Sequence, residues 1–176
     1  FCRLYQVRWS KEVIHLNTYE ELLQDADDEQ VHVHESVDLN GDSTGEKRLN
    51  GLYVDGHIAL DSQLKTTAEK TSILAEEMGH HFTSVGDITD LKNVNSRQQE
   101  LDARLWGYNR LIGLRGIIRA FEHHCQNRYE MAEYLDVTED YLEEALACYR
   151  SKYGVYTVVD NYAIYFIPNI AVAKRF

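Results

Sequence analysis

Glu76 and His80 are four positions apart in the sequence, and Glu77 directly follows the first of them. In a helix this spacing places positions 76 and 80 on one face, a turn apart. The His-Glu-x-x-His motif of zinc peptidases spaces two metal ligands in this way, and its glutamate deprotonates the metal-bound water. Here a glutamate replaces the first histidine, and a carboxylate can also bind zinc. The pattern therefore predicts Glu76 and His80 as metal ligands and Glu77 as the general base.

The neighbouring register lacks a residue that the chemistry needs. If Glu77 and His81 were the ligands, Met78 would occupy the position of the base, and its thioether cannot move a proton. The alternative to any metal site is an amphipathic helix with a solvated acidic face and two incidental histidines. A short motif alone favours that alternative, because such motifs often occur by chance.

The residues around the motif predict a helix of about four turns over residues 67–81. Thr66 and Glu69 have the spacing of a capping box, in which each side chain bonds the backbone N–H of the other residue. Ile73 and Leu74 suit a side that packs into the core. Such a helix would hold the motif against the rest of the fold.

Composition narrows the class of protein. The 176 residues, with 44% hydrophobic content, predict one domain with a genuine core, and no apolar run is long enough to span a membrane. A net charge of −11 argues against broad binding to nucleic acids or anionic membranes. Three scattered cysteines predict neither a disulfide framework nor a cysteine-based zinc site, so a cytoplasmic location is expected.

Hydrophobic periodicity and turn signals predict the remaining elements. Helices are predicted at 17–28, from 96 onwards, and at 114–123, 126–136 and 138–153. Strands are predicted at 31–34, 51–54, 57–60, 153–159 and 162–167, with a polar turn at 39–45 and a loop at 82–88. His32 and His34 would share one face of their strand and could chelate a metal, but exposed histidines on an edge strand are the preferred interpretation.

Two segments together carry a family resemblance: Leu-Ala-Glu-Glu-Met-Gly-His-His at 74–81, and Glu-Leu-Asp-Ala-Arg-Leu-Trp-Gly at 100–107. The chain resembles the ImmA/IrrE family of metallopeptidases from about residue 19 to 166, in particular members carried by phages and integrated elements of Gram-positive bacteria. The resemblance implies that His80 and Glu100 are metal ligands and Glu77 the base, with Glu76 in the place of the first histidine. Zn²⁺ is the implied ion, and a second carboxylate ligand could instead favour Mn²⁺ or another divalent ion.

The fold expected on this basis is α+β: a small twisted β-sheet, a zincin-like metal helix packed on it, and a C-terminal helical region that resembles a helix-turn-helix. Residues 1–17 would be an extension outside the resemblance, 18–113 the metallopeptidase-like core, and 114–176 a helical region with a terminal β-hairpin, packed as one unit with the core. His81, Tyr108 and His57 are candidates for positions around the ligands. An exposed strand at 57–60 could hold a substrate peptide as an added strand.

The resemblance implies an endopeptidase that cleaves a phage-type helix-turn-helix repressor in the cytoplasm of a bacterial host, which would derepress phage or mobile-element genes. One alternative is an antirepressor with a weakened site that acts by protein binding. Another is a DNA-binding regulator that uses residues 128–152, but the net charge of −4 over that segment argues against direct contact with nucleic acid. The sequence leaves the oligomeric state open.

Overall fold

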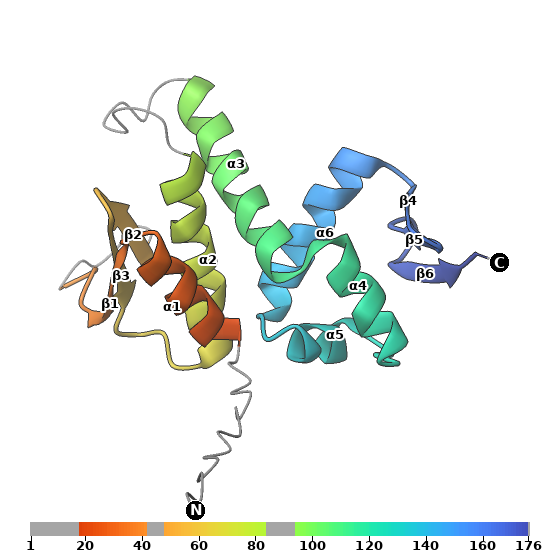
Figure 1. The fold of residues 1–176 in the computed structure, drawn as a ribbon, viewed down its shortest axis with the longest axis horizontal. Helices are drawn as coiled ribbons and strands as arrows, with labels where there is room; N and C mark the ends of the chain where they lie inside the picture. The colour runs from red at the N-terminus through yellow and green to blue at the C-terminus, as the bar shows by residue number, and fades with distance from the viewer. Residues whose placement is uncertain (1–17, 42–47, 84–93, 176) are drawn as a thin grey trace, which may run out of the picture.

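The protein has a mixed α+β fold, described here from a computed structural model of residues 18–41, 48–83 and 94–175 (Figure 1). The predictions for residues 1–17, for the end of the turn at 39–45 and for residues 84–88 of the predicted loop lie outside the described residues, whereas Phe82 and Thr83, also predicted as loop, are the last two residues of a helix. The helices are α1 (Thr18–Asp28), α2 (Thr67–Thr83), α3 (Val94–Leu111), α4 (Gly113–Glu122), α5 (Arg128–Tyr134) and α6 (Glu139–Tyr153). The strands are β1 (His32–Val37), β2 (Gly51–Val54), β3 (His57–Asp61), β4 (Tyr156–Val159), β5 (Tyr162–Tyr165) and β6 (Ala171–Lys174).

The first sheet has the strand order β1-β3-β2. Strands β2 and β3 form the hairpin predicted around Asp55-Gly56, and both turn residues have positive φ, as such a turn requires. Strand β1 pairs with β3 in parallel. Because β3 is hydrogen-bonded on both sides, the expectation that residues 57–60 could accept a substrate strand is wrong. The edges of this sheet are β1 and β2.

The second sheet has the order β4-β5-β6, with both strand pairs antiparallel. The hairpin of β4 and β5 around Asp160 was predicted, but β6 was not. Its four residues, Ala-Val-Ala-Lys, carry a weak strand signal because alanine and lysine are depleted in strands. Strand β6 is thus defined by its pairing with β5.

Helix α2 begins as predicted. The Glu69 carboxylate accepts a hydrogen bond from the Thr66 backbone N–H at 2.8 Å, and the Thr66 hydroxyl accepts one from the Glu69 N–H at 3.2 Å. This reciprocal pair is a capping box, which satisfies donors that the first helical turn leaves free. One side of the helix, including Leu74 and Met78, is completely buried.

Small residues let α2 and α3 lie side by side (Figure 1). A Cβ added at Gly79 would lie 2.2 Å from the Ala103 carbonyl oxygen, and one added at Gly107 would lie 2.7 Å from the Tyr141 hydroxyl and 3.0 Å from the Ala75 carbonyl oxygen. Any side chain larger than hydrogen would therefore force the two helices apart at these points. This close approach brings the motif helix against the helix that carries Glu100.

Asp61 fixes the segment between β1 and β2. Its carboxylate is almost fully buried and accepts hydrogen bonds from the backbone N–H groups of Leu39 and Gln63 and from the side-chain amide of Asn40. Burial acts to raise the pKa of Asp61, but these hydrogen bonds outweigh it and hold the pKa below its ordinary value. The ionised form is thus the one that the fold stabilises.

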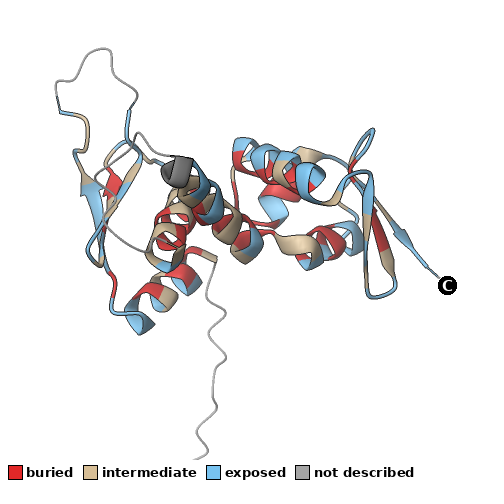
Figure 2. Ribbon diagram, turned by 90° about the horizontal axis from the view of Figure 1, so that it is seen from above, coloured by how far each residue is buried: buried red, intermediate tan, exposed pale blue. Residues whose placement is uncertain are grey.

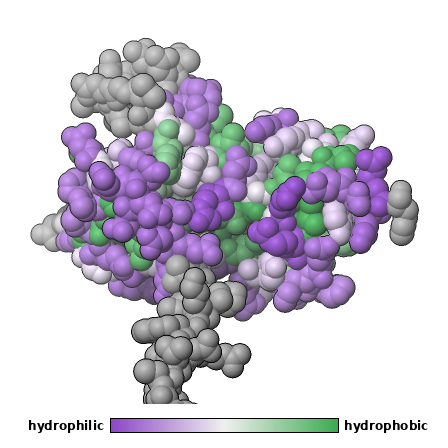
Figure 3. Space-filling view, in the orientation of Figure 1, coloured by the Kyte–Doolittle hydropathy of each residue, from purple (hydrophilic) through white to green (hydrophobic). Residues whose placement is uncertain are grey.

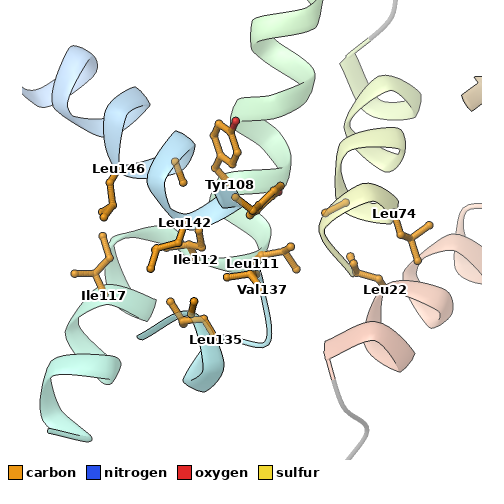
Figure 4. Packing of buried hydrophobic residues seen from close by; sticks show 14 of the residues in the cluster. Leu22, Leu74, Tyr108, Leu111, Ile112, Ile117, Leu135, Val137, Leu142 and Leu146 are labelled. Atoms are coloured by element: carbon orange, nitrogen blue, oxygen red, sulfur yellow. The ribbon is translucent and has the colours of Figure 1, made fainter. Parts of the chain in front are cut away.

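The hydrophobic core extends from α1 and α2 through α3 into the C-terminal helices (Figure 4). Figure 4 shows Leu142 and Leu146 of α6 facing Ile117 of α4, with Leu135, the residue after α5, below them. Figure 2 shows the buried residues on the inward sides of the helices, whereas Figure 3 shows that hydrophilic side chains predominate on one face, over α1 especially. No helix among the described residues is long and apolar enough to cross a bilayer.

Candidate metal centre

The three residues predicted as metal ligands meet between α2 and α3. Glu76 and His80 lie one turn apart on α2, and Glu100 lies on α3. One ligand atom from each lies within 4.8 Å of the other two, and the His80 Nε2 atom is 3.6 Å from Glu100 Oε2. Among the described residues, no other three histidine, cysteine or acidic side chains come together in this way.

The spacing and the donor types fit a divalent cation. Ligands at about 2.0–2.2 Å from a tetrahedral zinc ion lie about 3.3–3.6 Å from one another, so the His80–Glu100 pair needs almost no adjustment. The Glu76 carboxylate needs a shift of at most about 1.2–1.5 Å, the difference between 4.8 Å and this spacing, which side-chain rotation can supply. One imidazole and two carboxylates suit Zn²⁺ and are also hard enough for Mn²⁺.

Arg104 is one residue of this site that was not predicted from the sequence. Its Nε atom lies 3.2 Å from Glu76 Oε1, and its terminal nitrogen lies 2.9 Å from Glu100 Oε1. The guanidinium therefore neutralises the same two carboxylates that would bind a metal. Its position four residues after Glu100 on one helix was the available signal, since residues at that spacing share a helix face.

Glu77 is buried beside the three ligands, with 8% of its surface exposed. Its carboxylate lies under strand β2: a Cβ added at Gly51 would come within 2.5 Å of Glu77 Oε1, and the Tyr53 backbone N–H donates a hydrogen bond to the carboxylate. Gly51 was also missed, although a glycine inside a strand is a known signal of close approach by another group. Only the absence of a side chain at Gly51 leaves room for Glu77.

The pKa of Glu77 is raised to about 8, first by burial and then by the negative charges of Glu76 and Glu100, while the Tyr53 N–H acts in the opposite direction. Burial likewise raises the pKa of Glu76, and Arg104 partly offsets that rise. The carboxylates of Glu76, Glu77 and Glu100 thus lie close together with only the Arg104 guanidinium as counter-charge. A bound cation would reduce the repulsion among the three carboxylates.

The predicted surrounding residues have different positions. The His81 Nδ1 atom lies 3.0 Å from the Tyr53 hydroxyl, and its Nε2 atom lies 3.9 Å from Glu29, so His81 touches the strand that holds Glu77. His57 is on the outer face of the first sheet, where it contacts His34, because strand alternation turns Ile58 and not His57 toward the core. The suggestion that His57 approaches the site is therefore wrong.

Tyr108 lies one turn beyond Arg104 on α3 and is 4% exposed. Its hydroxyl donates a hydrogen bond to Glu144 of α6 at 2.9 Å, and its ring meets the Tyr141 ring edge to face. Tyr108 therefore connects α3 to the C-terminal helices, and it lies close enough to the site for the charges of Arg104 and Glu76 to act on its hydroxyl. The Tyr141 hydroxyl is buried without a hydrogen-bond partner among the described residues.

No family model, no curated protein and no solved structure matches this chain. Its class is therefore defined by its own fold and residues. That class is a mixed α+β protein in which two adjacent helices hold a candidate divalent-metal site and a buried glutamate next to it.

Proposed function

We propose that the chain is a metal-dependent endopeptidase that resembles the ImmA/IrrE family. One observation carries the proposal: ligand atoms of Glu76, His80 and Glu100 lie within 4.8 Å of one another, and Glu77 is buried next to them. The glutamate after the first ligand is the residue that acts as the base in zinc peptidases. An incidental acidic helix face would leave that glutamate in solvent.

Each residue would have a defined role in peptide-bond hydrolysis. A divalent ion held by Glu76, His80 and Glu100 would polarise the scissile carbonyl and lower the pKa of a bound water. Glu77 would accept a proton from the attacking water and pass it to the leaving amine. Burial, which acts on Glu77 with or without a bound ion, raises its pKa and so favours a carboxyl that can both take up and release a proton.

The substrate proposed from the resemblance is a repressor of the phage type with an N-terminal helix-turn-helix. An extended segment of it would pair with β2, since β2 is the edge strand that lies over Glu77. Cleavage would release the repressed phage or mobile-element genes. The test is to incubate the purified chain with the repressor encoded at its own locus, with and without a chelator, and to look for fragments.

Metal analysis tests the ligands. The purified protein should hold about one divalent ion per chain, preferably Zn²⁺ or Mn²⁺, and His80→Ala should lose it. His123→Ala removes an exposed histidine from another part of the fold and is the matched control. If His80→Ala kept its full metal content, the ligand assignment would be refuted.

Glu77→Gln separates catalysis from binding. Glutamine keeps the size of the side chain but cannot accept a proton. We expect cleavage to fall by about 10²–10⁴-fold while metal content stays at the parental level. If Glu77→Gln derepressed target genes in cells as well as the parent does, the hydrolase proposal would fail.

A second candidate function is an antirepressor that acts by docking, and the position of Arg104 favours it. A guanidinium that bonds both Glu76 and Glu100 can replace a metal ion as their counter-charge. In that case the parent protein would bind no divalent ion, and chelator would not affect derepression. Arg104→Gln would then be expected to create metal binding that the parent lacks.

Direct DNA binding is disfavoured by the packing of α6, which would be the recognition helix. Its N-cap, Thr138, lies against α2, with its backbone N–H 3.5 Å from the Ser72 hydroxyl, and Tyr141 and Leu142 are buried. The side of this first turn that stays exposed carries Glu139 and Asp140, whose carboxylates would repel phosphates. A salt titration of duplex DNA binding tests this, because real phosphate contacts give a steep salt dependence.

A further inference from the structure

We infer that the outer face of the first sheet carries a second metal site, formed by His32, His34 and His57 and suited to a borderline transition-metal ion such as Ni²⁺, Cu²⁺ or Zn²⁺. All three side chains are exposed. The site is separate from the proposed peptidase site, because Ile58 and Leu60 of the same strand face the opposite side and are fully buried. The inference does not depend on the proposed function.

The pairing of β1 with β3 brings these histidines together. His32 is directly opposite His57 in the parallel register, and His34 is two residues further along the same strand, on the same face. The ring centroids of His32 and His34 lie 5.1 Å and 5.4 Å from that of His57, so both rings are neighbours of the His57 ring. Only tertiary pairing could place the third imidazole here.

Two nitrogen atoms already have the separation of ligands on one ion. The His34 Nε2 atom lies 3.1 Å from His57 Nδ1, which is a hydrogen bond from one ring to the other that a bound ion would replace. Nitrogens bound at about 2.0–2.1 Å lie about 2.8–3.0 Å apart at adjacent square-planar positions and about 3.3–3.4 Å apart in a tetrahedron, so the observed distance fits between the two. The three histidines do not yet bring one nitrogen each within 4.8 Å of the others, so the exposed His32 side chain must rotate to add a third imidazole, and water would complete the coordination.

The three imidazoles predict which ions bind at the histidine site. Neutral imidazole favours Ni²⁺, Cu²⁺ and Zn²⁺, with Cu²⁺ the strongest by the general order of divalent metals, whereas Mn²⁺ and Mg²⁺ prefer carboxylates. The Glu76–His80–Glu100 site has two carboxylates and one imidazole, so it accepts Mn²⁺ more readily than the histidine site does. Mn²⁺ should therefore fill only the site between the helices, and Ni²⁺ should still bind when that site has been removed.

The test uses the full chain, prepared without a histidine tag, in a His80→Ala background that disables the first site. Calorimetric titration with Ni²⁺ should show about one ion per chain. Adding His34→Ala or His57→Ala should weaken binding by more than the ~10–100-fold that loss of a residue outside the ligand shell typically costs. Adding His123→Ala, at an exposed histidine far along the chain, should leave the affinity unchanged.

A second readout identifies the ligands themselves. With one equivalent of Cu²⁺, electron paramagnetic resonance of the His80→Ala protein should show nitrogen hyperfine structure, which His57→Ala should reduce. Matching melting temperatures without metal will show that the variants are folded. Absence of Ni²⁺ binding in the His80→Ala protein, or unchanged binding after both His34→Ala and His57→Ala, would overturn the proposal.

Discussion

The buried carboxyl of Glu77 should make the stability of the metal-free protein fall as the pH rises. Its pKa is raised from an ordinary value of 4.5 to about 8 in the folded chain. Between these two values the folded state holds a proton that the unfolded state has released. The free energy of unfolding must therefore decrease with increasing pH throughout this window.

The size of the effect follows from the displacement of the pKa. At about 1.4 kcal/mol per pH unit, a change from 4.5 to about 8 corresponds to at most about 5 kcal/mol of lost stability above pH 8. Relaxation and water entry around the ionised carboxylate would reduce this, so a loss of about 2–5 kcal/mol is expected. That is a large part of the stability of a typical domain.

Urea denaturation of chelator-treated protein from pH 5 to pH 9 measures this loss. Glu77→Gln stays neutral, so it should match the parent near pH 5 and exceed its stability by about 2–5 kcal/mol above pH 8. Glu76, whose pKa is raised in the same direction, should leave a smaller slope in the variant. Glu133→Gln, at an exposed position, is the control and should follow the parent at every pH. Parallel pH profiles for the parent and Glu77→Gln would refute the burial argument.

Three further changes test the packing around the site. Asp61→Ala should lower the free energy of unfolding in urea by about 2–4 kcal/mol at neutral pH, because buried N–H donors lose their acceptor. The pKa of Asp61 is lowered in the folded state, so this difference from the parent should shrink below about pH 4. Gly79→Ala should lower stability by about 2–3 kcal/mol and reduce metal content, since its Cβ would meet the Ala103 carbonyl, whereas Gly116→Ala should stay within about 1 kcal/mol of the parent. Gly51→Ala should displace the Glu77 side chain, so that repressor cleavage falls while metal content is kept.

The helices and hairpins could be predicted from the sequence because the signals for them are local. The capping box of Thr66 and Glu69 and the turn at Asp55-Gly56 involve residues at most four positions apart. Strand β6 escaped prediction because its residues have little strand preference of their own and form a strand by pairing with β5. The parallel pairing of β1 with β3 was not predicted either. It joins two segments that are distant in the chain, and no local signal indicates such a pairing.

The candidate metal site likewise combines features that follow from local spacing with features that depend on tertiary packing. The spacing of Glu76 and His80 on one helix face, with Glu77 next to them, is determined by the sequence through the helical repeat alone. Whether Glu100 reaches His80 depends on how closely α2 and α3 pack, and that distance is limited by Gly79.

The tertiary structure also decided which groups several of these side chains meet. Arg104 bonds both carboxylates because two helices carry them to either side of its guanidinium. Gly51 makes room for Glu77 because β2 crosses over α2, and the alternation of β3 turns His57 outward to meet His34. Helical and turn periodicity fix which side chains share a face, but only the packing of distant segments fixes what that face meets.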